Sequence, residues 1–398
     1  MKFFAYLICY LIYPFSFLFP RYSKKWAFGS FRKSFNDNAK YLFIHCQQHY
    51  PNIDSAWITM NKEVVSTMQK KGLKVYYTLS PKGIWHALTS KFWFYNSYSS
   101  DIMYCLSGRA VCINLWHGVG LKRTEFNIQT GALAARYQEK RLKEIFFHPE
   151  VFKRPDWFLS STPFQTKMFA SAFRIPETRC LEFGYPRNEI LTTREPDRQA
   201  FIDKFESADT RHLLDFIKNG LYTKVFIYMP TWRDSQREIF TQSFDLEKTN
   251  AIMKEKNALL LLKPHANTLI NNKDFEHYDN IRLIDSKTDI YPILPYSDVL
   301  ITDYSSILYD YILMPNKNVI LYLYDYKDYI HHRDLYYPFD ENIVGKMVFN
   351  FSELCQSIEN NDYQIDDLQK TELVKKFWGE TIYQDSCERL VEHVFHLL

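Results

Sequence analysis

The chain has 398 residues, 46% of them hydrophobic and 24% charged, which is enough apolar material for two cores in a globular protein. The 49 Lys plus Arg against 46 Asp plus Glu give a net charge of +3 without a long basic block, which argues against a nucleic-acid binder. The seven cysteines form no CxxC pair, so free thiols in a reducing compartment are favoured over disulfides or a structural zinc.

The chain begins with an uncharged, aromatic-rich segment, residues 3 to 20. The segment does not suit a secretory signal, because it lacks a small-residue cleavage site. It does not suit a spanning helix either, because such a helix needs about 20 apolar residues without a central proline such as Pro14. Arg21, Lys24 and Lys25 follow the segment, so we expect it to lie in the headgroup region of an anionic membrane surface. The alternative is a helix packed on the protein's own core.

Strand and helix patterns alternate along the rest of the chain, which predicts mostly parallel sheets with helices on both faces. A loop-like composition at 184–196 separates two such halves. The predicted strands are 26–28, 55–59, 74–77, 92–96, 111–116 and 157–159 in the first half, and 224–229, 258–263, 281–283, 299–302 and 318–323 in the second.

The predicted fold class is therefore α/β, with two doubly wound Rossmann-like domains that face each other across a cleft, the architecture called GT-B in glycosyltransferases. The expected parts are the apolar membrane-associating segment at 1–25, an N-terminal Rossmann-like domain at 26–190, a C-terminal Rossmann-like domain at 191–372, and terminal helices at 373–398.

The strand predicted at 111–116 is followed by His117 and Gly118. An imidazole with a pKa near about 6.5 is the side chain best suited to remove a proton from an alcohol at neutral pH, and a glycine lets backbone approach a ligand. His117 is thus a candidate general base, although a histidine hydrogen-bonded under a loop is the structural alternative. Lys122 either steers an acidic acceptor or is simply solvated.

Three strands of the second half also end in polar residues. Ligands bind beyond the carboxyl ends of strands in open α/β sheets, and hydroxyls, an arginine fork and helix-start N–H groups together suit a phosphate. The simpler alternatives are a helix cap for the Asp and Ser residues, a surface ion pair for the arginine and a strand end for the threonine. The residues concerned are Thr231, Arg233, His265, Asp303, Ser305 and Ser306.

The candidate residues belong to longer motifs spread along the chain. These are Phe28-Gly29-Ser30-Phe31, Asp37-Asn38-Ala39-Lys40-Tyr41, Trp116-His117-Gly118 with Leu121-Lys122, Gly184-Tyr185-Pro186-Arg187-Asn188, Pro230-Thr231-Trp232-Arg233-Asp234, Lys263-Pro264-His265, Asp303-Tyr304-Ser305-Ser306 and the aromatic stretch from Tyr322 through Tyr336 to Glu341. The motifs resemble, in the same order, those of the CDP-glycerol glycerophosphotransferases that build teichoic acids and related capsule polymers, and the resemblance covers about residues 26 to 345. It implies that the N-terminal domain is on the acceptor side and that the C-terminal domain binds the CDP donor. Val119-Gly120 and Ala266 depart from the usual pattern, and the first departure leaves the acceptor's identity in doubt.

The resemblance implies transfer of glycerol phosphate from CDP-glycerol to a hydroxyl of a glycan or lipid-linked glycan acceptor, with release of CMP. It places the base at His117 and assigns His265 to catalysis. Arg233, Thr231, Ser305 and Ser306 are expected to hold the donor phosphates, while Asp303 either binds the donor or orients its loop. Asp310 lies one helical turn beyond Ser306, where it either binds ribose hydroxyls or is solvated.

We expect no essential metal and no other cofactor, because donors of this kind can replace a cation at the phosphates. The expected location is the cytoplasmic face of the membrane, beside other capsule or wall polymer enzymes and without nucleic acid. Three alternatives stay open: a CDP-ribitol-dependent enzyme, a GT-B nucleotide-sugar glycosyltransferase, and a non-catalytic membrane-associated scaffold.

Overall fold

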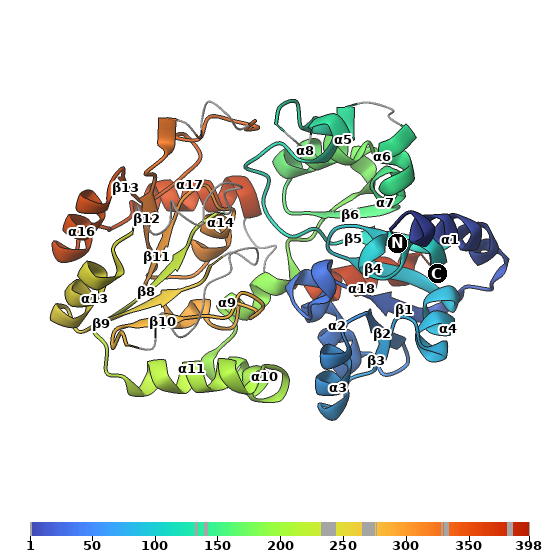
Figure 1. Ribbon diagram of the computed structural model, residues 1–398, viewed down its shortest axis with the longest axis horizontal. Helices are drawn as coiled ribbons and strands as arrows, with labels where there is room; N and C mark the ends of the chain where they lie inside the picture. Colours follow the sequence, from blue (N-terminus) through green and yellow to red (C-terminus); the bar gives the residue numbers. More distant parts are fainter. Residues whose placement is uncertain are drawn as a thin grey trace. The chain divides into compact units, whose positions relative to one another are not determined.

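The computed structural model describes residues 2–131, 134–138, 142–231, 244–264, 275, 277–327, 329, 334–379 and 385–397. The chain divides into two compact units, Met1–Glu189 together with Trp378–Leu398 (unit 1) and Ile190–Phe377 (unit 2) (Figure 1). Each unit contains a parallel sheet, which confirms the predicted α/β class.

The sheet of unit 1 has the strand order β3-β2-β1-β4-β5-β6-β7, and its strand pairs are parallel. Its central strands are almost continuous apolar runs, as expected where helices cover both faces of a parallel sheet. The strands are β1 (Tyr22–Phe28), β2 (Asp54–Thr59), β3 (Val75–Tyr77), β4 (Ser90–Tyr95), β5 (Val111–Asn114), β6 (Trp157–Ser160) and β7 (Cys180–Glu182).

Side-chain caps begin several helices of unit 1: Asn61 caps α3, Ser80 caps α4 and Thr162 caps α8, each accepting a bond from a backbone N–H group of the first turn. The helices are α1 (Lys2–Phe15), α2 (Asp37–His49), α3 (Lys62–Lys70), α4 (Pro81–Thr89), α5 (Ala134–Gln138), α6 (Leu142–Phe147), α7 (Pro149–Phe152), α8 (Pro163–Phe173), α9 (Glu189–Thr192) at the boundary, and α18 (Ser386–His396).

Unit 2 has the strand order β10-β9-β8-β11-β12-β13, again with parallel pairs. The strands are β8 (Lys224–Met229), β9 (Ala258–Leu262), β10 (Ile281–Leu283), β11 (Val299–Thr302), β12 (Asn318–Tyr322) and β13 (Lys346–Val348). The helices are α10 (Glu195–Phe205), α11 (Ala208–Asn219), α13 (Leu246–Glu255), α14 (Ile307–Tyr311), α16 (Phe351–Glu359) and α17 (Asp367–Trp378).

Both sheets reverse their strand order at one place, between β1 and β4 in unit 1 and between β8 and β11 in unit 2. At these places the strands end level with each other: Phe28 pairs with Phe94, and Met229 pairs with Thr302. The loops that follow the paired strands therefore start side by side. Ligands bind at such switch points in doubly wound folds, so the topology marks one candidate position in each unit.

Several strands end earlier than the sequence predicts. The strand predicted at 111–116 stops at Asn114, because Trp116 has a φ of 52°, a left-handed conformation that no strand adopts. The strands predicted to reach Asn96 and Lys263 likewise stop one residue short. The polar residues thus lie in loops at the carboxyl edge of each sheet.

The edge strands β7 and β13 were not predicted from the sequence. Each has only three residues, too few to show a clear pattern of apolar and polar side chains.

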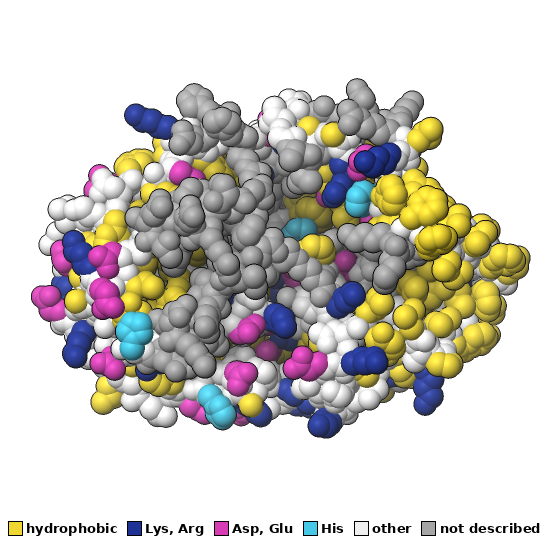
Figure 2. Space-filling view, viewed as in Figure 1, with side chains coloured by type: hydrophobic (Ala, Val, Ile, Leu, Met, Phe, Trp, Pro, Cys, Tyr) yellow, Lys and Arg dark blue, Asp and Glu magenta, His cyan; other side chains and the backbone are white. Residues whose placement is uncertain are grey.

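Helix α1 packs one face on unit 1 and exposes the other. Tyr13 stacks on Tyr104 with 4.8 Å between ring centroids, and the Tyr10 hydroxyl donates to the Ile145 carbonyl at 2.8 Å. The opposite face carries exposed Phe4, Leu7, Ile8, Leu11 and Phe15. Figure 2 shows hydrophobic side chains gathered over the region that Figure 1 labels α1. No helix in the described ranges is long and apolar enough to cross a membrane.

Arg21 does not have the membrane-facing position expected from the sequence. Its guanidinium donates to the backbone carbonyls of Ala87, Ser90, Leu106 and Gly108. Because burial disfavours the charged form, the pKa of Arg21 is lowered to about 10. A guanidinium offers several donors in a fixed fork, so Arg21 ties the end of α4 to the loop before β5.

The end of the chain returns to unit 1 at Trp378. Helix α18 packs on α2, where Glu388 accepts a bond from the Tyr50 hydroxyl and lies 3.2 Å from His45 Nε2. Glu189 Oε1 accepts a bond from Cys387 N at 2.7 Å, which fastens the start of α18 to the start of α9. Helix α2 begins with the Asp37-Asn38 motif, so the chain's last helix supports an element of the candidate site.

Candidate active site

His117 follows β5 in a tightly turned loop of unit 1. Asn114 Oδ1 accepts a bond from Trp116 N at 2.9 Å, and Leu115 N donates to the Tyr95 carbonyl at 2.8 Å. The left-handed conformation of Trp116 costs on the order of 1–2 kcal/mol for an ordinary residue. This cost indicates that the surrounding contacts fix the loop in a shape that the backbone alone would not adopt.

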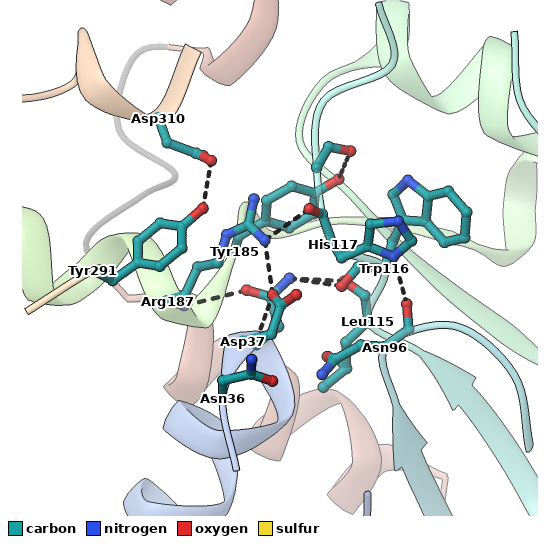
Figure 3. A network of polar contacts seen from close by, with 12 residues as sticks. Asn36, Asp37, Asn96, Leu115, Trp116, His117, Tyr185, Arg187, Tyr291 and Asp310 are labelled. Carbon is teal, nitrogen blue, oxygen red and sulfur yellow. Dashed lines mark hydrogen bonds and ion pairs between the residues drawn. The ribbon is translucent and has the colours of Figure 1, made fainter. Parts of the chain in front are cut away.

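The imidazole of His117 has one nitrogen fixed by the backbone. Nδ1 lies 3.0 Å from the carbonyl oxygen of Asn96, the first residue after β4 (Figure 3). A carbonyl can only accept, so Nδ1 carries the hydrogen and the neutral ring has its lone pair on Nε2. Asn96 is fixed in turn, since its Nδ2 donates to Ser30 Oγ at 2.8 Å and its Oδ1 accepts from Ala39 N at 3.0 Å.

His117 is exposed, yet the protein atoms around its ring lower its pKa below the usual value. Desolvation is the main cause, because it disfavours the imidazolium, and the Arg187 guanidinium acts in the same direction. The Asp37 carboxylate and the Asn96 carbonyl act in the opposite direction. A lowered pKa keeps the ring neutral at pH 7, the form that a general base needs.

Arg187 connects the loop at residues 115–118, which we call the histidine loop, to the start of α2. Its Nη1 donates to the His117 carbonyl at 2.8 Å and to Asp37 Oδ1 at 2.7 Å (Figure 3). The Arg187 side chain is only 3% exposed and that of Asp37 is 21% exposed. A charge as deeply buried as this one requires a partner, and Asp37 supplies it.

The other acceptor-side residues lie in the same loop of unit 1. Gly118 is buried, and its carbonyl accepts a bond from the Tyr185 hydroxyl at 3.0 Å. Gly120 N donates to Gln165 Oε1 at 3.0 Å, which ties the loop to α8. Lys122 is half-buried.

In unit 2, Asp303 and Thr231 meet at the switch point. Thr231 N donates to Asp303 Oδ1 at 2.9 Å, and the Thr231 hydroxyl donates to the same carboxylate. The hydroxyl hydrogen of Thr231 is therefore directed at Asp303, and the carboxylate holds the loop after β8. This contact favours the loop-orienting role of Asp303 over direct donor binding.

Ser305 and Ser306 lead into α14, which has only five residues. The sequence predicts the positive end of a helix here, but so short a helix has a small dipole. Both serines are half-buried, and Ser305 Oγ accepts a hydrogen bond from Ile307 N at 3.4 Å.

Asp310 is buried and is not a solvated acid, which was the alternative to ribose binding in the sequence analysis. It is 1% exposed and accepts a hydrogen bond from the Tyr291 hydroxyl at 2.6 Å (Figure 3).

Arg233 and His265 lie outside the described residues. The neighbouring Lys263 is described and buried, with its Nζ donating to the Asp285 carbonyl at 2.6 Å. Burial lowers the pKa of Lys263 to about 8, against the opposing effect of Asp285 and Asp289. Within the described ranges, His, Cys, Asp and Glu side chains form no group of three that would suit a metal ion.

Sequence reasoning gave no role to Asn96, Asn38, Tyr185, Arg187 or Tyr291. Asn96 carries the same signal as His117, a polar residue directly after an apolar strand, so it could have been found. Asn38, Tyr185 and Arg187 were noticed only as parts of motifs, because no local pattern shows which loop a distant side chain reaches.

The family described as CDP-Glycerol:Poly(glycerophosphate) glycerophosphotransferase matches residues 11–396, nearly the whole chain. The chain belongs to this family. The protein is therefore an enzyme that transfers a polyol phosphate from a CDP-linked donor, and the family resemblance seen in the sequence is confirmed.

Two relatives of Staphylococcus aureus illustrate the similarity. The chain is 28% identical over 346 residues to a teichoic acid glycerol-phosphate transferase, covering 84% of this chain and 83% of that one. It is 31% identical over 291 residues to the teichoic acid ribitol-phosphate polymerase TarK, covering 71% of this chain and 52% of that one. The chain thus spans only about half of the polymerase.

Among solved structures, the wall teichoic acid polymerase TagF soaked with CDPG has the same fold. The TM-score is 0.73 at 23% identity, over 94% of this chain and 89% of that chain. This likeness supports the GT-B-like architecture of parallel sheets.

Proposed function

We propose that the enzyme transfers glycerol phosphate from CDP-glycerol to a hydroxyl of a membrane-linked or capsule or teichoic-acid-type glycan, with release of CMP and with His117 as the general base. The observation that carries this proposal is the bond from His117 Nδ1 to the Asn96 carbonyl, because it leaves the Nε2 lone pair of an exposed ring to accept a proton.

The proposed step balances as follows. The acceptor O–H bond breaks and its proton passes to His117 Nε2, while the acceptor oxygen forms a bond to the phosphorus that carries the glycerol. The bond from this phosphorus to the bridging oxygen breaks, and CMP leaves with that oxygen and its electron pair. Negative charge grows on the leaving phosphate, so the reaction needs fixed donors around it.

We assign these donors to unit 2. Ser305 and Ser306 supply hydroxyls from the loop after β11, while Arg233 and His265 are proposed from the resemblance. Thr231 and Asp303 hold the loop after β8 through their mutual contact. Asp310, which is fixed by Tyr291, is the proposed partner of the ribose hydroxyls.

We propose further that no metal is essential, because the cationic and hydroxyl donors already supply the charge that a cation would. Treatment with EDTA is expected to leave the transfer rate within twofold of that of the untreated enzyme. A loss that added Mg²⁺ or Mn²⁺ restores would contradict this part of the proposal.

The test is incubation with CDP-glycerol and a glycan acceptor, followed by mass determination of the product and assay of CMP. His117→Ala is expected to lower transfer at least about a hundredfold, as loss of a general base does, with donor binding retained. His212→Ala, which removes an exposed histidine of α11, is the matched control. Wild-type turnover in the His117 variant would remove His117 from the mechanism.

CDP-ribitol is the second candidate donor, because TarK, a ribitol-phosphate polymerase by name, is 31% identical to this chain. The same assay run with CDP-ribitol distinguishes the two donors by the mass added per transfer. One added unit or many also separates a primase from a polymerase.

We propose that the enzyme works at the cytoplasmic membrane surface, beside other enzymes of wall or capsule polymer synthesis. The exposed apolar face of α1 supports this location. All seven cysteines are free, as suits a reducing compartment.

A further inference from the structure

Four consecutive backbone carbonyls of the histidine loop each accept a hydrogen bond from a side chain. Asn38 Nδ2 donates to the carbonyls of Leu115 and Trp116, both at 3.0 Å. Arg187 Nη1 donates to the His117 carbonyl at 2.8 Å, and the Tyr185 hydroxyl donates to the Gly118 carbonyl at 3.0 Å. We call Asn38, Tyr185 and Arg187 the carbonyl clamp.

The carbonyl clamp brings together two motifs to which the proposed mechanism gives no role. Asn38 is the second residue of α2, whereas Tyr185 precedes the 3-10 helix Pro186–Asn188 that follows β7, and Arg187 lies within it. The two segments are also bonded to each other, because Arg187 N donates to Asn38 Oδ1 at 3.2 Å. One amide group thus binds the histidine loop with its nitrogen and the other clamp segment with its oxygen.

The clamp residues are buried and have defined partners. Asn38 and Tyr185 are 0% exposed and Arg187 is 2% exposed. A buried donor is costly unless it meets an acceptor, so each clamp residue requires the loop's carbonyls to stay where they are. The left-handed Trp116 lies in the middle of this loop, which is where an external constraint is needed.

We propose that Asn38, Tyr185 and Arg187 are positioning residues for the transfer reaction. They fix the backbone of the loop from 115 to 118, and this backbone, together with the Asn96 carbonyl, sets the direction of His117 Nε2. The inference rests on the proposed role of His117 as the base. Proton transfer requires the base to lie within hydrogen-bonding reach of the acceptor hydroxyl, so a loosened loop lowers turnover without changing donor affinity.

The most specific test of the clamp is Tyr185→Phe, because it removes only the hydroxyl that binds the Gly118 carbonyl and keeps the ring. It is expected to lower kcat about tenfold, with the KM for CDP-glycerol unchanged. Asn38→Ala removes three hydrogen bonds, two to the histidine loop and one from Arg187 N, and is expected to lower kcat further. Two matched controls remove hydrogen bonds elsewhere in the chain. Tyr363→Phe removes the hydrogen bond from the hydroxyl of a buried tyrosine to Asn361 Oδ1, and Asn280→Ala removes the hydrogen bond from a side-chain amide to the Ala258 carbonyl.

A second measurement reports on the clamp without any reaction. In enzyme labelled with ¹⁵N-histidine, the His117 imidazole is expected to show one Nδ1–H form in the wild type. In Tyr185→Phe it is expected to show a broadened signal and a pKa closer to about 6.5, because the ring is less confined. The control variants are expected to keep the wild-type signal.

The two measurements separate failure of the clamp from failure of the proposed function. If His117→Ala keeps full turnover while Tyr185→Phe alters the His117 signal, the base assignment fails and the clamp stands. If Tyr185→Phe shows the kcat and the imidazole signal of the wild type, or if Tyr363→Phe lowers kcat equally, the clamp inference is overturned.

Discussion

Two opposite charges act on His117 at the scale of single residues. Arg187 lowers the pKa of the imidazole and Asp37 raises it, and the two are paired with each other at 2.7 Å. Desolvation remains the main cause of the lowered pKa, and the two charges adjust it in opposite directions, so a single substitution can change the proton affinity of the base. This balance gives the pH dependence of transfer a definite sign.

Asp37→Asn is expected to move the acid limb of the pH profile to lower pH. The Asp37 carboxylate stabilises the imidazolium, so its removal lowers the pKa of His117 further below its usual value of about 6.5. Transfer requires neutral His117 and is lost as pH falls through that pKa, so the variant stays active at more acid pH. The measurement is log(kcat/KM) for the acceptor between pH 4.5 and pH 8.

Glu63→Gln, on the exposed surface of α3, is the control for Asp37→Asn because it removes one carboxylate of unit 1 away from the histidine loop. An acid limb that moves to higher pH in Asp37→Asn, or that stays in place, would contradict the assigned electrostatics.

Residues of the candidate site could be predicted where the signal was local. His117, Thr231 and Asp303 lie within three residues of the ends of apolar strands, so the topology of a parallel sheet places them at its carboxyl edge. The contact of the Thr231 hydroxyl with Asp303 could not be read from the sequence, since 72 positions separate the two residues. The roles of the clamp residues could not be predicted either, because each role depends on which distant backbone carbonyl the side chain binds.

At the scale of elements, α1 shows why composition alone left two readings open. Residues 3 to 20 carry no charge, so no charged face distinguishes the packed side from the exposed side. In the structure Tyr10 and Tyr13 pack on unit 1, while Phe4, Leu11 and Phe15 are exposed by 66%, 61% and 63%. The spacing of these three by seven and four residues places them on one helical face.

We expect the double variant Leu11→Asp and Phe15→Asp to lose binding to vesicles that contain anionic lipids. Two carboxylates on the exposed face would oppose both insertion of the face and its attraction to negative headgroups. Because both side chains are already exposed, the melting temperature is expected to change by less than about 2 °C. Cosedimentation with the vesicles measures the binding.

Leu368→Asp is the control for the vesicle experiment, since Leu368 is 70% exposed on α17 of unit 2. Equal vesicle binding by the double variant and the wild type would show that α1 is not the lipid-binding element.

At the scale of the whole molecule, unit 1 is assembled from both ends of the chain. Its sheet and most of its helices come from the first 189 residues, but α18 comes from the last 21. Leu390, Val391 and Val394 of α18 are fully buried. The sequence predicts terminal helices at 373–398, whereas the unit on which α18 packs depends on contacts such as that of Glu189 with Cys387, which no local pattern contains.

Leu390→Ala is therefore expected to destabilise unit 1 and to leave unit 2 intact. This result is expected even though residue 390 follows unit 2 in the sequence and is separated by it from the rest of unit 1. Truncating a fully buried leucine costs about 2–5 kcal/mol. Tryptophan fluorescence reports almost entirely on unit 1, because Trp232 is the only one of the eight tryptophans in the sequence of unit 2. The fluorescence-detected urea midpoint is expected to fall, while the Kd for CDP-glycerol in the absence of urea stays unchanged.

Leu354→Ala is the mirror control, because Leu354 is buried to a similar degree in α16 of unit 2. It is expected to lower the midpoint detected by far-ultraviolet circular dichroism, which reports on both units, with little change in the fluorescence midpoint. If both variants shifted both signals by the same amount, the units would unfold together, and the division of the chain at Glu189 and Trp378 would have no counterpart in its energetics.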